Sequence, residues 1–189
     1  MTSLNPIERC ALIDLTDLPR VGFRGLDAAV WLQQRGYELP QAPNQALFLA
    51  DGGMVARLSQ TEYLLLGSLS DRGERIAAEE AGWQLSAQRN YLLPRQDSHA
   101  WLQLSGRHVA EVMAKLCGVD LRSAAFPVGS VAQTSVARLN CIVINAGSAD
   151  LARFHILCDR ASLGYFQSAL LDAMGEFGGL PVSVESLLG

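Results

Sequence analysis

Two stretches of the chain alternate apolar and polar positions and then end at a glycine. The segment PRVGFRG has its apolar side chains at Val21 and Phe23, and the segment AWLQLSG has them at Leu102 and Leu104. Alternation with a period of two residues is typical of a β-strand with one buried face. Each stretch therefore predicts a half-buried strand that ends in a turn.

Each glycine is followed by a segment whose apolar side chains recur every three or four residues. These segments are residues 26–36, LDAAVWLQQRG, and residues 107–118, RHVAEVMAKLCG. Both end in a glycine, which often follows the C-terminus of a helix. Two further helices are predicted at residues 71–82 and 162–178.

The tetrapeptide VARL occurs twice, beginning at Val55 and at Val136, an offset of 81 residues. The glycines that follow the two alternating segments have the same offset. Each VARL is predicted to lie in a strand, and each precedes a further apolar strand, EYLLLGS or RFHILCD, and then the second helix. An insertion around Gly147 lengthens a hairpin in the second copy. The chain is therefore interpreted as one β-α-β-β-α unit written twice.

This repeat predicts an α+β fold with two pseudo-symmetric halves, each an antiparallel sheet backed by helices. The first half covers residues 10–85 and the second covers residues 99–182. Residues 83–99 form a packed joint between them. We expect residues 1–189 to make a single bilobal unit.

Composition limits the classes of partner. The chain has 189 residues, of which 49% are hydrophobic and 18% are charged, and its formal net charge is −4. This favours a globular protein without the basic face that nucleic-acid binding requires. No apolar run approaches the roughly 20 residues of a membrane span. We therefore expect neither nucleic acid nor membrane as a partner.

The cysteines indicate a reducing compartment. The four cysteines lie far apart without a Cys-x-x-Cys pair, and the three histidines show no ligand-like spacing. The segment MTSLNPIERC has no apolar region of the kind that signal peptides carry. The sequence thus predicts a cytoplasmic protein with reduced cysteines and no metal site.

The usual catalytic motifs are not found in this sequence. Ser105 and His108 are close together, but no Gly-x-Ser-x-Gly motif surrounds the serine, and Gly106 is explained by the strand-to-helix turn. The segment ADGGM resembles a tight hairpin turn and lacks the Lys-Ser/Thr end of a phosphate loop. No catalytic residue is assigned.

The segment QTSVARL carries the candidate binding residues, Thr134 and Arg138. On a strand, Thr134, Val136 and Arg138 share one face. An arginine beside a threonine can hold an anion or the carboxylate of a partner. An arginine that caps the sheet or pairs with an internal aspartate fits the same pattern, so both interpretations stay open.

The first half resembles the folate-binding aminomethyltransferase superfamily, which includes the T-protein of glycine cleavage. The segments ALIDLTDLPRVGFRGLDAAVWLQQ and LADGGMVARLSQTEYLLLGS carry this resemblance. The second half resembles a narrower family, the gamma subunits of heterotetrameric sarcosine oxidases. The segments KLCGVDLRSAAFPVGSVAQTSVARLNCIVI and FHILCDRASLGYFQSALLDAMGEFGG carry that likeness. Together the resemblances extend from about Cys10 to Gly179.

The departures from the superfamily pattern concern catalysis. Catalytic members have an acidic pair after the Gly-Gly turn, and one of its carboxylates works near the folate nitrogen. The matching positions here are Ala56 and Arg57, which cannot act as that carboxylate. The chain also lacks the K-G-C-Y-x-G-Q-E motif of the stand-alone iron–sulfur repair branch and the extra C-terminal domain of a full T-protein. The resemblance thus disfavours an aminomethyltransferase that works alone.

The resemblance implies a non-catalytic subunit that packs against alpha, beta and delta subunits. In such an oxidase those subunits hold FAD, NAD and covalently attached FMN, and they oxidise sarcosine to glycine and hydrogen peroxide. The one-carbon fragment can pass to tetrahydrofolate in the large subunit. This chain is expected to bind none of these cofactors itself. The alternative is a free-standing folate- or pterin-binding module.

Aromatic side chains are the candidates for contact with a partner. The centres of protein interfaces are enriched in aromatic residues, so three of them could anchor a partner: Trp31, Trp101 and Tyr165. The alternative is that these three residues belong to the core.

Overall fold

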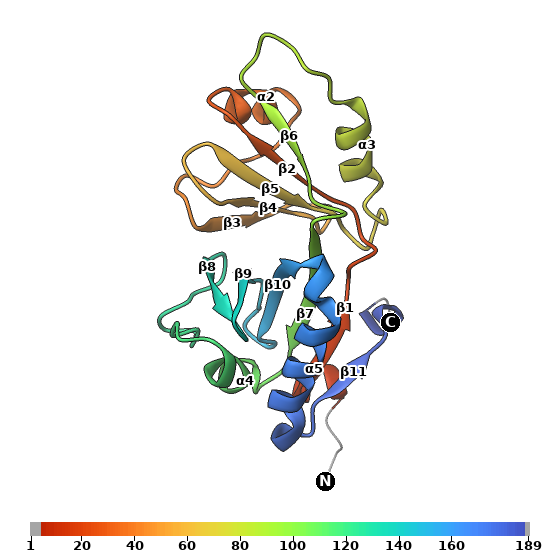
Figure 1. Ribbon diagram of the computed structural model, residues 1–189, viewed down its shortest axis with the longest axis vertical. Helices are drawn as coiled ribbons and strands as arrows, with labels where there is room; N and C mark the ends of the chain where they lie inside the picture. Colours follow the sequence, from red (N-terminus) through yellow and green to blue (C-terminus); the bar gives the residue numbers. More distant parts are fainter. Residues whose placement is uncertain (1–4, 188–189) are drawn as a thin grey trace. The chain divides into compact units, whose positions relative to one another are not determined.

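The computed structural model describes residues 5–187, and these form two compact units (Figure 1). The middle unit comprises residues 17–98. The terminal unit combines residues 5–16 with residues 99–187, so it holds both ends of the described chain. Each unit is a mainly antiparallel sheet with helices packed on one face, which confirms the predicted α+β fold class.

The sheet of the middle unit has the strand order β3-β4-β5-β2-β6, and every neighbouring pair is antiparallel. Its strands are β2 (Arg20–Arg24), β3 (Gln45–Phe48), β4 (Met54–Arg57), β5 (Glu62–Leu66) and β6 (Tyr91–Pro94). Its helices are α2 (Ala28–Gln34) and α3 (Glu74–Gly82). Val21 and Phe23 are both buried against α2 and α3, as their alternation predicted. Gly52, with φ of 87°, lies in the predicted tight turn before β4.

The sheet of the terminal unit has the order β11-β1-β7-β10-β9-β8, and only β1 and β11 pair in parallel. Its strands are β1 (Ala11–Asp14), β7 (His99–Ser105), β8 (Val131–Val136), β9 (Leu139–Asn145), β10 (Arg153–Asp159) and β11 (Leu180–Val182). Its helices are α1 (Pro6–Arg9), α4 (Val109–Leu116) and α5 (Leu163–Met174), and short 3-10 turns are η1 (Arg160–Ser162), η2 (Gly175–Phe177) and η3 (Val184–Leu187). The apolar stripes of α4 and α5 pack on one face of the sheet around Leu102 and Ile156.

Strands β1 and β6 each pair in a different sheet from the strand that follows them in the chain. Strand β1 directly precedes β2 in the chain, yet it pairs with β7 in the terminal unit. Strand β6 directly precedes β7, yet it pairs with β2 in the middle unit. The joint expected at residues 83–99 thus contains a paired strand. The exchange also explains why the structural units differ from the halves at residues 10–85 and 99–182.

Apart from the exchanged strands, the two units share one order of elements. The series β2-α2-β3-β4-β5-α3 corresponds to β7-α4-β8-β9-β10-α5, and the sheet orders agree. Each copy has one more strand after its first helix than the sequence pattern predicted. In the second copy the extra strand is β9. The lengthened hairpin around Gly147 is the loop between β9 and β10.

The two VARL segments are not structurally equivalent, so this part of the prediction is wrong. Val55, Ala56 and Arg57 lie within β4. In the second copy Val136 ends β8 and Leu139 begins β9, because Ala137 and Arg138 form the turn between these strands. The element that corresponds to β4 is β9. The two units share an order of strands and helices, but the two VARL tetrapeptides lie at different positions in that order.

Candidate functional site

The sequence resemblance implies that Ala56 and Arg57 stand at the positions of the acidic pair in catalytic aminomethyltransferases. Ala56 lies in β4 and is fully buried. Its neighbour Arg57 donates hydrogen bonds to four backbone carbonyls, at 3.2 Å to Pro40, 2.8 Å to Gln41, 3.3 Å to Ser59 and 3.1 Å to Gln60. The guanidinium thereby ties the segment before β3 to the hairpin after β4. It is a structural cation, and no carboxylate stands at either position.

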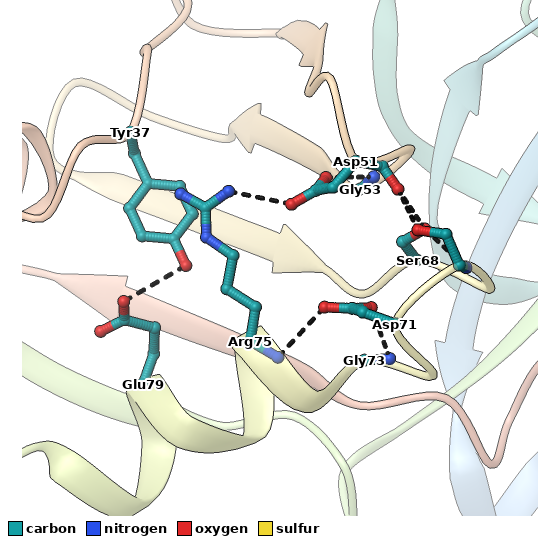
Figure 2. A network of polar contacts seen from close by, with 9 residues as sticks. Tyr37, Asp51, Gly53, Ser68, Asp71, Gly73, Arg75 and Glu79 are labelled. Atoms are coloured by element: carbon teal, nitrogen blue, oxygen red, sulfur yellow. Dashed lines mark hydrogen bonds and ion pairs between the residues drawn. The ribbon is translucent and has the colours of Figure 1, made fainter.

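A connected polar network occupies the middle unit (Figure 2). Arg75 in α3 forms an ion pair with Asp51 at 2.9 Å, and its guanidinium lies 4.3 Å from the centre of the Tyr37 ring. The Tyr37 hydroxyl donates to Glu79 at 3.4 Å, and Glu79 also pairs with Arg35. Burial, followed by the nearby Glu79 charge, raises the pKa of Tyr37 to about 12.

The carboxylates at the ends of this network hold turns in place. Asp51 accepts the Gly53 amide at 2.9 Å, and Asp71 accepts the amides of Gly73 and Arg75 at the start of α3. Desolvation opposes the ionisation of Asp51, but the Gly53 amide and Arg75 outweigh it and lower its pKa. Asp51 pairs with Arg75 and Glu79 pairs with Arg35, so these contacts hold the turns and α3 of the middle unit in place.

Thr134 and Arg138 do not share a strand face, which corrects the sequence-based prediction. Thr134 lies in β8 opposite Cys141. Arg138 has φ of 69° and follows Ala137 with φ of 48°, so the two make a two-residue hairpin turn. Arg138 is exposed there. Thr134 lines a groove of about 330 Å³ that also includes His99, Gln133, Ser135, Asn140 and Leu157.

The terminal unit has buried polar residues on the sheet face that points away from α4 and α5. Trp101 Nε1 donates to His155 Nδ1 at 2.9 Å, and both side chains are buried. Desolvation, assisted by the charge of Arg153, lowers the pKa of His155 to about 3. The imidazole is therefore neutral at physiological pH. Gln103 and Ser105 lie on the same face of β7 and are also buried.

The cysteines are interior residues of the terminal unit. All four are free and buried, and Cys158 pairs in register with Cys141. Burial raises the pKa of Cys141 to about 12 and that of Cys158 to about 11. Residues 5–187 contain no group of three potential ligands that could hold a metal ion. They also contain no helix that is long and apolar enough to cross a membrane.

The three aromatic candidates for contact with a partner lie in different surroundings. Trp101 is 1% exposed and belongs to the interior of the unit. Trp31 is half-buried, its ring is tilted against that of Phe23, and the Arg35 guanidinium lies over it. Tyr165 is 54% exposed, although its hydroxyl donates to the Ala137 carbonyl at 3.0 Å. Of these three aromatic residues, Tyr165 alone has more than half of its surface exposed, as contact with a partner requires.

The order of strands and helices defines an aminomethyltransferase-like fold. The aminomethyltransferase T of the glycine cleavage system from Bartonella henselae is similar in fold, with a TM-score of 0.62 at 15% identity. That match covers 87% of this chain and 46% of the other.

The model of the sarcosine oxidase gamma subunit family matches residues 24–176, and the chain belongs to this family. The sarcosine oxidase subunit gamma of Corynebacterium sp. (strain P-1) is 28% identical over 162 residues, which cover 86% of this chain and 74% of that one. A chain of the heterotetrameric sarcosine oxidase from Corynebacterium sp. U-96, in complex with pyrrole 2-carboxylate, has a TM-score of 0.73 at 24% identity. That match covers 93% of this chain and 89% of the other.

Proposed function

We propose that this chain is the non-catalytic gamma subunit of a cytoplasmic heterotetrameric sarcosine oxidase, assembled with alpha, beta and delta subunits. The partners would carry FAD, FMN and NAD and demethylate sarcosine oxidatively to glycine, with the one-carbon unit passing to tetrahydrofolate. The observation that carries the non-catalytic role is the structure around Ala56 and Arg57. A buried methyl group and a guanidinium bound to four carbonyls replace the acids of a transferase.

Surface composition supports a role in assembly. Large apolar side chains are exposed in both units, and each of the following is at least 46% exposed: Leu26, Val30, Phe48, Leu85, Tyr91, Val128, Tyr165 and Leu180. Exposed aromatic and aliphatic side chains lose contact with water when a partner covers them, which favours association. Because the chain belongs to a family of oxidase subunits, we expect another protein to cover these exposed side chains.

Purification of the tagged chain from its native host tests the proposal. We expect three further proteins in the eluate by mass spectrometry, with flavin absorbance and hydrogen peroxide production on addition of sarcosine. The chain produced alone should be colourless and inactive. A single colourless species from the native host would contradict the proposal.

A folate- or pterin-binding module is the second candidate, and the groove beside Thr134 is the observation that favours it. The polar residues Gln133, Ser135 and Asn140 line the groove together with the apolar residues Ile142 and Leu157. Titration of the isolated chain with tetrahydrofolate should raise its melting temperature if this function is correct. A Thr134→Val variant should then lose the shift.

A further inference from the structure

Four polar side chains form a two-by-two block on the face of the terminal sheet that points away from α4 and α5. Ser105 lies opposite Arg153, and Gln103 lies opposite His155, on the adjacent strands β7 and β10 (Figure 1). The residues that alternate with them belong to the helix-side core. The four side chains therefore extend from neighbouring positions of one face.

Three residues of the block are buried, Arg153 is half-buried, and several atoms of the block have no partner. Ser105 is 0% exposed, Gln103 is 3% exposed and His155 is 6% exposed. Among the described residues, no hydrogen-bond partner lies within reach of Ser105 Oγ, Gln103 Nε2 or Arg153 Nε. Folded proteins leave few buried polar atoms unpaired, so three in one block need an explanation.

All four side chains present hydrogen-bond donors. The hydroxyl of Ser105, the amide nitrogen of Gln103 and Nε of Arg153 each carry a hydrogen. His155 accepts at Nδ1 from Trp101, so its neutral ring carries the hydrogen on Nε2 and donates there as well. Four donors on adjacent positions need an acceptor that can take several hydrogen bonds.

The charge of the block is also unbalanced. Arg153 forms no ion pair with any residue of the described chain. The strand neighbours of the block cannot supply one, because Ala11 and Ile13 of β1 lie on one side and Ile144 of β9 lies on the other. Arg153 is half-buried and its Nε is buried, so a counter-charge beside this nitrogen would stabilise it.

We propose that this block is a carboxylate-binding site. Arg153 supplies the positive charge, and Gln103, Ser105 and His155 supply further donors. A carboxylate has two oxygens with about four acceptor positions, which matches the number of donors and the missing charge. The carboxylate belongs either to a small molecule or to an acidic side chain of another subunit, and the second source rests on the proposed function.

The first test uses the full chain and sodium acetate as the probe, with sodium chloride at equal ionic strength as the control. The Arg153 Nε–Hε resonance is followed by ¹⁵N-resolved NMR together with the melting temperature. We expect a saturable resonance shift and a higher melting temperature. Arg153→Met should abolish both effects. Arg107→Met removes an exposed arginine of the same unit and should leave both unchanged.

Two further measurements separate a binding arginine from a structural one. Without acetate, Arg153→Met should melt at or above the wild-type temperature, because an unpaired, half-buried charge has been removed. A purely structural arginine would lower the melting temperature when removed. Gln103→Leu and Ser105→Ala keep the charge and should weaken acetate binding, which keeps the test valid if Arg153→Met folds poorly.

Co-expression with the three partner subunits identifies the source of the carboxylate. If acetate does not bind, but Arg153→Met reduces co-purification roughly tenfold or more while Arg107→Met does not, the carboxylate belongs to a partner. If acetate does not bind and both variants co-purify like the wild type, the site is refuted. If the wild type itself does not co-purify, the proposed function fails, and the acetate titration alone decides the site.

Discussion

The carbonyl of Arg89 lies so close to Gly25 that a Cβ on this glycine would be 1.8 Å from the carbonyl oxygen. The same relationship recurs in the terminal unit, where a Cβ on Gly106 would lie 2.5 Å from the carbonyl of Arg9. The segment before β6 therefore passes close to the turn at Gly25, and the segment before β1 passes close to the turn at Gly106. The two contacts hold β6 beside β2 and β1 beside β7.

Gly25→Ala should strongly destabilise the chain. The backbone of Arg89 has to move, and φ of +148° at Gly25 also disfavours a side chain, so we expect a loss of more than about 3 kcal/mol in the free energy of unfolding. Gly118→Ala is the matched control, because no atom lies within 4 Å of its added Cβ. Urea unfolding followed by circular dichroism measures both. Equal midpoints for the two variants would refute the close-approach explanation.

Arg57→Met should destabilise the middle unit by about 2–3 kcal/mol, because four backbone carbonyls lose a charged donor. Arg57→Lys keeps the charge but has no planar fork, so it should recover only part of the loss. Thermal unfolding of the isolated chain measures the effect. A loss below about 0.5 kcal/mol for Arg57→Met would show that these contacts are not structural.

Alternation and helical periodicity predicted most of the fold. Val21, Phe23, Leu102 and Leu104 are in strands with their side chains in the core, and the predicted helices all form. The exchange of β1 and β6 was not predictable in this way. Alternation identifies which face of a strand is buried, but it carries no information about which neighbour the strand pairs with.

The candidate site could be predicted only in part. The resemblance drew attention to Ala56 and Arg57, but the sequence did not predict the hydrogen bonds from Arg57 to backbone carbonyls. The placement of Arg138 on a strand was wrong, because Ala137 and Arg138 both adopt positive φ without the glycine or asparagine that signals such a turn. The polar block was missed, although polar residues at alternate positions of AWLQLS and RFHILCD were a visible signal for it.

Replacing the turn residues Ala137→Asn and Arg138→Gly should stabilise the terminal unit. Both positions have positive φ, which costs an ordinary side chain roughly 1 kcal/mol and suits an Asn-Gly turn. We expect a gain of about 1 kcal/mol, measured as a higher urea midpoint. Thr134→Asn and Ser135→Gly, placed within β8, form the control pair and should lower the midpoint. A decrease for the turn pair would show that these side chains make contacts that outweigh the strain.

The buried imidazole of His155 should make the stability of the chain depend on pH. Its pKa is about 3 in the folded chain and about 6.5 when unfolded, so below pH 6.5 the unfolded state binds a proton that the folded state does not. Stability is therefore complete above pH 6.5 and falls by about 1.4 kcal/mol for each pH unit down to about 3. Between pH 7.5 and 5.0 this group should remove about 2 kcal/mol. His155→Gln keeps an acceptor for Trp101 Nε1 but does not titrate. Titrating carboxylates change the stability of both proteins equally, so the difference between the two stability losses comes from the histidine. Urea midpoints at both pH values measure this difference, and parallel losses in the two proteins would show that the imidazole is protonated without cost.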